Sequence, residues 1–242
     1  MKQIVSIIVA TLFFAYLIFS IIMLQGKTQE IDCQNLIVVI KDSTDRQFLT
    51  MDNIVTILKN AQLYPVNKPL HSINTHEIEE KIAESELVSG VIVYKTPSGN
   101  VKIEISQKMP ILRIFSARES YYVDELGGTM PADYQYATYL PVANGNIDKL
   151  FATTELYKFA LFLQKNEFWN NQVEQIYVLP NTEVELIPRI GGHRIILGSF
   201  EDFEEKMNNL RLFYEQAIPK IGWGKYETIN LKYKNQIVCT KN

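Results

Sequence analysis

An uncharged apolar run near the N-terminus restricts this chain more than any other feature. Residues 4–24 read IVSIIVATLFFAYLIFSIIML and contain no Asp, Glu, Lys or Arg. A helix of this length spans about 31 Å at ~1.5 Å per residue, which matches the hydrocarbon core of a bilayer. The run therefore predicts a single transmembrane helix, with a tail of residues 1–3 before it and a polar linker of residues 25–32 after it.

A cleaved signal peptide is the alternative interpretation of this run. Such a peptide has a shorter apolar region, followed by a cleavage site of small residues. Here the run ends in IIMLQGKTQE, which contains no such site, so an uncleaved signal anchor is favoured. Because so short a tail is easily kept inside, we expect a single-pass protein of the bacterial inner (cytoplasmic) membrane. Its N-terminus would lie in the cytoplasm and the bulk of the chain in the periplasm.

The first folded part, residues 33–109, has the pattern of a small α+β unit. An apolar run at 35–40 predicts a strand, and Thr50 is suited to cap the helix that follows it. A second helix is expected at 75–85, followed by two strands around the turn sequence TPSG at 96–99. The fold class is therefore α+β, with a β-α-α-β-β order in this part.

The second folded part, residues 110–242, predicts a β-rich domain that carries two helices. The helices are expected at 149–165 and 200–217, where apolar residues recur at helical spacing. Ser199 with Asp202 resembles a capping box at the start of the second helix. Strands are expected at 111–116, 120–125, 138–143, 173–179, 183–188 and 194–198, and a single last strand at 227–239.

No catalytic or metal-binding motif occurs in the sequence: G-x-S-x-G, H-E-x-x-H, C-x-x-C and phosphate-binding glycine loops are all absent. His71, His76 and His193 have no partner at ligand spacing, so we expect each to be a surface residue. Cys33 and Cys239 are expected to be unpaired. The formal net charge of −3 argues against a nucleic-acid partner. We expect no catalytic residue, metal, cofactor or small-molecule substrate.

The stretch SYYVDELGGTMP at 120–131 leaves one enzymatic alternative open. Asp124 and Glu125 precede two glycines, and an envelope enzyme acting on cell-wall glycan would need a pair of carboxylates. Neighbouring residues of a strand point to opposite faces, however, which is poor geometry for cooperation. Because Asp-Glu-x-Gly-Gly is typical of a β-turn, a turn is the favoured interpretation.

Three stretches together carry a resemblance to a known family. They are NKPLHSINTHEIEEKIAESELVSGVIVYKTPSGNVKIEISQKMPILRI at 67–114, with its QKMP junction at 107–110, SYYVDELGGTMP at 120–131, and NLKY at 230–233. In these stretches and in its order of elements the chain resembles the FtsQ/DivIB family of bacterial cell-division proteins. The first folded part resembles a POTRA (polypeptide-transport-associated) domain.

The sequence departs from the family pattern at several points. Gln107 stands where the family usually has Glu, and the tail of residues 1–3 is shorter than in many relatives. Lys232 replaces a usual Arg, which keeps the charge but loses the bidentate fork of the guanidinium group.

The resemblance implies a non-enzymatic scaffold of the division machinery, the divisome, at the division septum. Such proteins link early division components to septal peptidoglycan synthesis, and they bind FtsB- and FtsL-like proteins outside the membrane. A terminal strand with a free edge suits this role, because a partner segment can add to it by β-strand addition. The residues expected to bind partners are Ile229, Asn230, Leu231, Lys232, Tyr233, Lys234, Gln236 and Val238.

Some alternatives stay open at this point. Tyr233 is explained equally well by packing and by partner contact. The POTRA-like part could also take a strand at its own edge. A POTRA-bearing transport component is a third interpretation of the whole chain.

Overall fold

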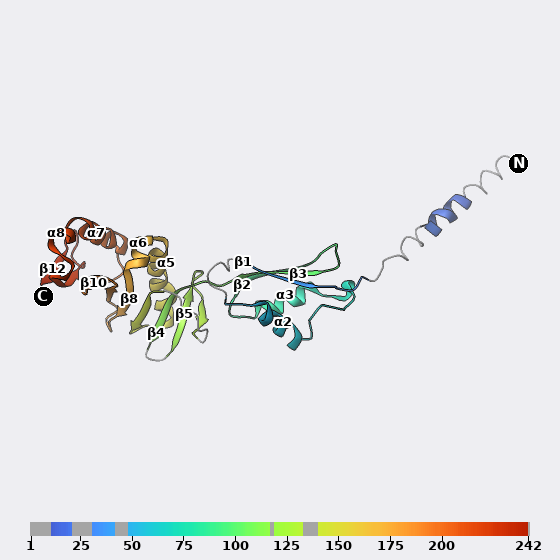
Figure 1. The fold of residues 1–242 in the computed structure, drawn as a ribbon, viewed down its shortest axis with the longest axis horizontal. Helices are drawn as coiled ribbons and strands as arrows, with labels where there is room; N and C mark the ends of the chain where they lie inside the picture. Colours follow the sequence, from blue (N-terminus) through green and yellow to red (C-terminus); the bar gives the residue numbers. More distant parts are fainter. Residues whose placement is uncertain (1–10, 21–30, 42–47, 117–118, 133–139, 242) are drawn as a thin grey trace.

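The computed structural model of the protein describes residues 11–20, 31–41, 48–116, 119–132 and 140–241. Residues 11–20 are helical, and two globular parts follow one another along the chain after them (Figure 1). Within these ranges no helix is long and apolar enough to cross a membrane. Much of the predicted span at 4–24 lies outside the described residues, so the span stays a prediction.

The first globular part has the predicted β-α-α-β-β order. Its sheet has the strand order β1-β3-β2, in which β1 runs parallel and β2 antiparallel to β3. Thr50 caps the first helix as predicted, because its hydroxyl accepts a hydrogen bond from the backbone N–H of Asn53. The elements are β1 (Leu36–Lys41), α2 (Met51–Asn60), the 3₁₀ turn η1 (Leu70–Ser72), α3 (Thr75–Ala83), β2 (Val88–Lys95) and β3 (Val101–Gln107).

Alternation along β3 explains how this sheet meets its helices. Val101, Ile103 and Ile105 are fully buried, whereas Lys102 and Glu104 between them lie on the opposite face. A strand with one apolar face must cover that face with another layer. The helices supply this layer with Ile54, Leu58, Ile78 and Ile82.

The second globular part is built on a nine-stranded mixed sheet with the order β12-β11-β10-β9-β8-β7-β4-β5-β6. Two strand pairs near its middle, β4 with β7 and β7 with β8, are parallel, and so is the pair β10 and β11. The strands are β4 (Pro110–Ser116), β5 (Ser120–Asp124), β6 (Thr129–Pro131), β7 (Val142–Gly145), β8 (Val173–Val178), β9 (Val184–Pro188), β10 (Arg194–Gly198), β11 (Tyr226–Asn230) and β12 (Val238–Lys241).

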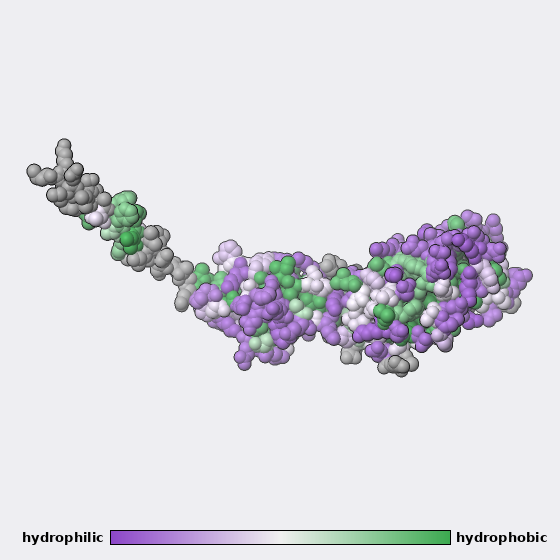
Figure 2. All heavy atoms as spheres, turned by 180° about the vertical axis from the view of Figure 1, so that it is seen from behind, coloured by the Kyte–Doolittle hydropathy of each residue, from purple (hydrophilic) through white to green (hydrophobic). Residues whose placement is uncertain are grey.

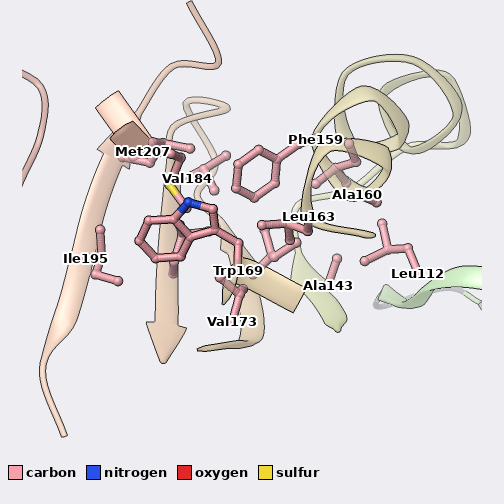
Figure 3. Packing of buried hydrophobic residues seen from close by; sticks show 14 of the residues in the cluster. Leu112, Ala143, Phe159, Ala160, Leu163, Trp169, Val173, Val184, Ile195 and Met207 are labelled. Carbon is pink, nitrogen blue, oxygen red and sulfur yellow. The ribbon is translucent and has the colours of Figure 1, made fainter. Parts of the chain in front are cut away.

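The helices of this part pack on one face of the sheet. Trp169 is fully buried and lies among Phe159, Val184, Ile195 and Met207, which come from two helices and two strands (Figure 3). The described helices do not pack on the other face, although Tyr122 and Met130 on that face are buried in the hydrophobic cluster of the first globular part. The helical segments are α4 (Lys149–Phe151), a π-helical turn η2 (Ala152–Leu156), α5 (Tyr157–Lys165), α6 (Glu167–Gln172), α7 (Phe203–Gln216), α8 (Ile218–Ile221) and the 3₁₀ turn η3 (Trp223–Lys225).

Hydrophobic residues also reach the surface of both globular parts (Figure 2). On the second part, Phe115, Tyr177 and Val238 are among the large apolar side chains that are exposed. The strand register connects these three residues in one row of paired residues that crosses the sheet. Because paired residues share a face, all three lie on the face away from the helices. This face is therefore mixed rather than uniformly polar.

The prediction of a single last strand at 227–239 is wrong. The chain turns over residues 231–237 and returns as β12, which pairs antiparallel with β11. The backbone N–H of Lys232 donates to Oδ1 of Asn230 at 2.9 Å, and Asn235 adopts a φ of 58°. The side chain of asparagine bonds to nearby backbone groups, and asparagine tolerates the left-handed region. Asn230 and Asn235 therefore reverse the chain, although the alternation of apolar residues continues through this stretch.

The second long helix also begins differently from the prediction. α7 starts at Phe203, and Asp202 before it has a φ of 51° and makes no capping hydrogen bond through its side chain. The capping box of Ser199 and Asp202 is therefore not formed. The sequence pattern does not predict α6 and α8, because helices this short show no clear periodicity.

Candidate functional site

β12 lies at one end of the nine-stranded sheet, so one of its sides has no neighbouring strand within the described part of the chain. β11 lies inside the sheet, between β10 and β12. The backbone N–H of Leu231 donates to the carbonyl of Ile196 at 2.9 Å, on the side of β10. Because backbone groups alternate along a strand, Ile229 also faces β10, whereas Asn230 faces β12.

This alternation determines which backbone groups of β12 face the open side. Asn230 stands opposite Val238, and the two exchange hydrogen bonds because Asn230 faces β12. Cys239 follows Val238, and Lys241 lies two residues further along β12. By the same alternation, both direct their N–H and C=O groups away from β11. The edge therefore offers the groups that a further strand needs.

The predicted partner-binding residues divide into buried and exposed ones. Ile229 and Leu231 are 0% and 3% exposed and belong to the core. Tyr233 and Val238 are 55% and 44% exposed. The first pair therefore helps to hold the strand in the sheet, whereas the second pair is exposed at the surface. The remaining predicted residues are half-buried or exposed: Asn230, Lys232, Lys234 and Gln236.

Lys232 fixes the turn between β11 and β12 to the rest of the sheet. Its ammonium group forms an ion pair with Glu183, and this hydrogen bond lowers the pKa of the Glu183 carboxyl. The stem of Lys232 crosses Gly198, where an added Cβ would lie only 2.7 Å from Cγ of the lysine. The charge that the family pattern places here therefore acts within the chain, on its neighbouring strands.

A pocket of about 320 Å³ lies between this turn and the start of α7. Lys206 reaches across its wall and donates to the carbonyl of Ser199 at 2.8 Å, and burial lowers the pKa of the Lys206 ammonium. The exposed Tyr233 is one of the residues that line this pocket. Its walls are formed by Ser199, Glu201, Asp202, Glu205, Lys206, Asn209 and residues 231–237.

The two cysteines are unpaired, as predicted. Cys33 is fully buried in the POTRA-like part. Cys239 lies on β12 with its thiol turned toward the core of the second part, and burial raises the pKa of this thiol. The open edge of β12 therefore offers backbone groups, whereas the thiol of Cys239 faces the core.

The expectation that His193 is a surface residue is wrong, although His71 and His76 are exposed as predicted. His193 is 1% exposed, and its Nε2 lies 2.6 Å from the hydroxyl of Tyr214 on α7. Its ring also stacks on Trp223, which precedes β11. A paired aromatic cluster of this kind is not visible from spacing, because its members come from separate elements.

Asp124 and Glu125 form a turn, as predicted. Asp124 is 1% exposed, and its Oδ1 accepts hydrogen bonds from the backbone N–H groups of Leu126 and Gly128 at 2.9 and 2.8 Å. Glu125 is exposed on the other side of the turn. Oδ1 of Asp124 is thus bonded to two backbone donors of the turn, whereas the side chain of Glu125 lies at the surface. Lys108 at the junction of the two parts lies 3.8 Å from Oδ2 of Asp124.

At the outer edge of the POTRA-like sheet, a side chain already pairs with one backbone donor. The backbone N–H of Val93 on β2 donates to the carboxylate of Glu79 on α3 at 2.7 Å. Strand addition at this edge would have to displace Glu79. His76 lies 3.8 Å from the same carboxylate and 3.3 Å from that of Glu80.

Within the described ranges, no group of three or more His, Cys, Asp or Glu residues is arranged to hold a metal ion.

Comparison with known families agrees with this division of the chain. A family model described as FtsQ/DivIB, C-terminal related, matches residues 109–240, and a model described as POTRA-like domain matches residues 31–106. No individual curated protein matches the chain. The first match covers more than half of the 242 residues and begins where the second globular part begins. The resemblance inferred from the sequence is confirmed, and the chain belongs to the FtsQ/DivIB family, whose members act in bacterial cell division.

Proposed function

We propose that this protein is a non-enzymatic scaffold of the divisome that binds FtsB- and FtsL-like division proteins by strand addition to β12. Through them it would be linked to septal peptidoglycan synthesis. The observation that carries the proposal is the open edge of β12, where Cys239 and Lys241 direct backbone groups away from β11.

The proposal includes an arrangement of the chain at the inner membrane. Residues 4–24 anchor the protein as a single-pass helix, so that both folded parts lie in the periplasm at the division septum. The proposed units are the cytoplasmic tail 1–3, the anchor 4–24, the linker 25–32, the POTRA-like domain 33–109 and the β domain 110–242.

An envelope enzyme that uses Asp124 and Glu125 is the alternative. The hydrogen bonds from Leu126 and Gly128 to Asp124 argue against it, because they hold this carboxylate in a turn. Purified protein is expected to leave peptidoglycan intact. Release of soluble glycan fragments that disappears in Asp124→Asn would support the enzyme instead.

The strand-addition proposal is tested at Lys241. The substitution Lys241→Pro removes a backbone N–H on the open side, whereas Lys241→Ala removes only the side chain. Full-chain protein in detergent is assayed for capture by the FtsB- and FtsL-like proteins of the same bacterium. We expect at least about tenfold weaker capture by the proline variant and near-normal capture by the alanine variant. If thermal melting shows that both variants are folded, equal capture by the two would contradict strand addition to β12.

A further inference from the structure

The sheet face away from the helices carries an arginine for which the described residues supply no acidic partner. Arg113 lies on β4, with the centre of its guanidinium group 4.6 Å from the ring centroid of Phe115 and 5.6 Å from that of Tyr122. Among the described residues, no carboxylate forms an ion pair with Arg113. Two aromatic rings therefore hold the cation in place, and no carboxylate in the described part of the chain compensates its charge.

The strand register places this arginine in a compact patch across three strands. Arg113 pairs with Tyr122 on β5, and Phe115 pairs with Ser120 on β5 and with Asn144 on β7. Paired residues share a face of the sheet, as do residues two apart on one strand. We call these five residues the Arg113 patch.

Three polar atoms of the Arg113 patch are shielded from solvent without a partner. They are Nε of Arg113, Oγ of Ser120 and Oδ1 of Asn144, none of which has a hydrogen-bond partner among the described residues. Buried polar atoms in folded proteins are almost always hydrogen-bonded, so each unpaired one needs an explanation. The contacts within the described residues therefore leave the hydrogen-bonding capacity of these three atoms unused.

An open cleft of about 580 Å³ adjoins the Arg113 patch. Phe115 forms one wall of the cleft and is 46% exposed. Glu174 stands among the other lining residues, with Val142, Asn144 and Gln175. An apolar side chain could pack on Phe115, while Glu174 disfavours a negative group at its own end of the cleft.

We propose that the Arg113 patch binds an acidic, partly apolar peptide segment of a partner protein. A carboxylate of the segment pairs with the guanidinium fork of Arg113, and a neighbouring apolar side chain packs on Phe115. The planar guanidinium fork can donate two parallel hydrogen bonds to a carboxylate. Because the flanking rings already restrict the Arg113 side chain, binding costs less conformational entropy. Arginine and aromatic residues are also the ones most enriched where protein interfaces bind tightly.

This site is separate from the one proposed at β12. β4 lies six strand-to-strand steps from β12 in the sheet, which is about 29 Å at ~4.8 Å per step. The Arg113 patch can therefore bind a segment whether or not a strand adds to β12, and either proposal can fail alone.

The test uses full-chain protein in detergent and a short peptide, blocked at both ends, in which glutamate alternates with leucine. A matched peptide carries glutamine in place of glutamate. Binding is measured by fluorescence anisotropy of the labelled peptides. We expect the glutamate peptide to bind at least about tenfold more tightly than the glutamine peptide, because only the former offers charge-assisted hydrogen bonds.

Substitutions assign the binding to the Arg113 patch. Arg113→Lys keeps the charge but removes the fork, and we expect it to weaken binding of the glutamate peptide about tenfold. Arg194→Gln removes an arginine from the same face that is already paired with Glu185, so it should leave binding unchanged. Lys241→Pro should also leave it unchanged, which separates this site from the one at β12. Phe115→Leu, which keeps an apolar side chain on β4, should weaken binding of both peptides.

Any one of these results would overturn the proposal: no binding of the glutamate peptide, equal binding of the two peptides, equal binding to wild type and Arg113→Lys, or an equal loss in Arg194→Gln. Free glutarate serves as a last arm. Binding of glutarate as tight as that of the peptide would show a small-carboxylate site and would contradict recognition of a peptide.

Discussion

The carboxylate of Glu79 accepts a hydrogen bond from the backbone N–H of Val93 at 2.7 Å on the outer edge of β2. Exposed sheet edges invite pairing with other chains, and natural proteins cover them in several ways. Here a side chain from α3 takes the position that a strand of another molecule would use. A side chain therefore pairs with the edge of the POTRA-like sheet at β2, whereas the edge at β12 has no such cover among the described residues.

Removal of this cover should open the edge of β2. Glu79→Ala leaves the N–H of Val93 without its acceptor, so we expect the protein to self-associate about tenfold more tightly. Glu79→Gln keeps an acceptor oxygen and should behave like wild type, as should Glu80→Ala. Sedimentation velocity over a range of concentrations measures the change. Glu79→Ala protein that is as monomeric as wild type would show that Glu79 does not protect this edge.

Gly198 should tolerate no side chain, because Lys232 crosses it. Gly198→Ala adds a contact of 2.7 Å with the lysine stem at a φ of 76°. Gly192→Ala is the matched control, since Gly192 has a φ of 64° but nothing within 4 Å of an added Cβ. We expect Gly198→Ala to lower the free energy of unfolding by about 1–3 kcal/mol more than the control does. Urea unfolding measures both, and equal losses would mean that Lys232 moves aside freely.

Stability should depend on pH through His193. Burial lowers the pKa of His193, so the unfolded chain binds the proton more readily than the folded one. The contribution is therefore fully present above the unfolded pKa of about 6.5 and is lost as the pH falls below it. We expect His193→Gln to flatten the decline in unfolding free energy between about pH 6.5 and 5, and the exposed His76→Gln to leave it unchanged. A decline that is the same in all three proteins would exclude His193 as its source.

Asp124 should matter for stability. Asp124→Ala removes the acceptor of two backbone N–H groups, and we expect a loss of about 1–3 kcal/mol in unfolding free energy. Asp124→Asn keeps one oxygen and should lose less, and Glu125→Ala should be close to neutral because Glu125 is exposed. Urea unfolding distinguishes the three. A neutral Asp124→Ala would mean that the glycines alone hold the turn.

The sequence allows most of the fold to be predicted where structure depends on local pattern. The cap at Thr50 is set by residues close together in the chain and is confirmed, and so are the two strands around the turn at 96–99. Lys149–Lys165 is helical as predicted, although a π-helical turn interrupts its α-helical geometry. Local periodicity is a sufficient signal in these cases.

Features that depend on distant contacts could not be predicted in this way. His193 is buried because Tyr214 and Trp223 reach it from elements that follow later in the chain. The turn between β11 and β12 was hidden because Leu231 and Ile237 continue the apolar alternation through it, so only Asn230 and Asn235 mark the reversal. The candidate site is therefore the short strand β12, which follows this turn, and not one long last strand.

The central claim is that a partner adds a strand to β12, and site-resolved amide hydrogen exchange tests it most directly. The backbone N–H groups of Cys239 and Lys241 face the open side, so they should exchange readily in the protein alone. With the FtsB- and FtsL-like partners bound, we expect exchange at both positions to slow at least about tenfold, because a partner carbonyl accepts each N–H. Unchanged exchange at Cys239 and Lys241 in a fully formed complex would contradict strand addition at this edge.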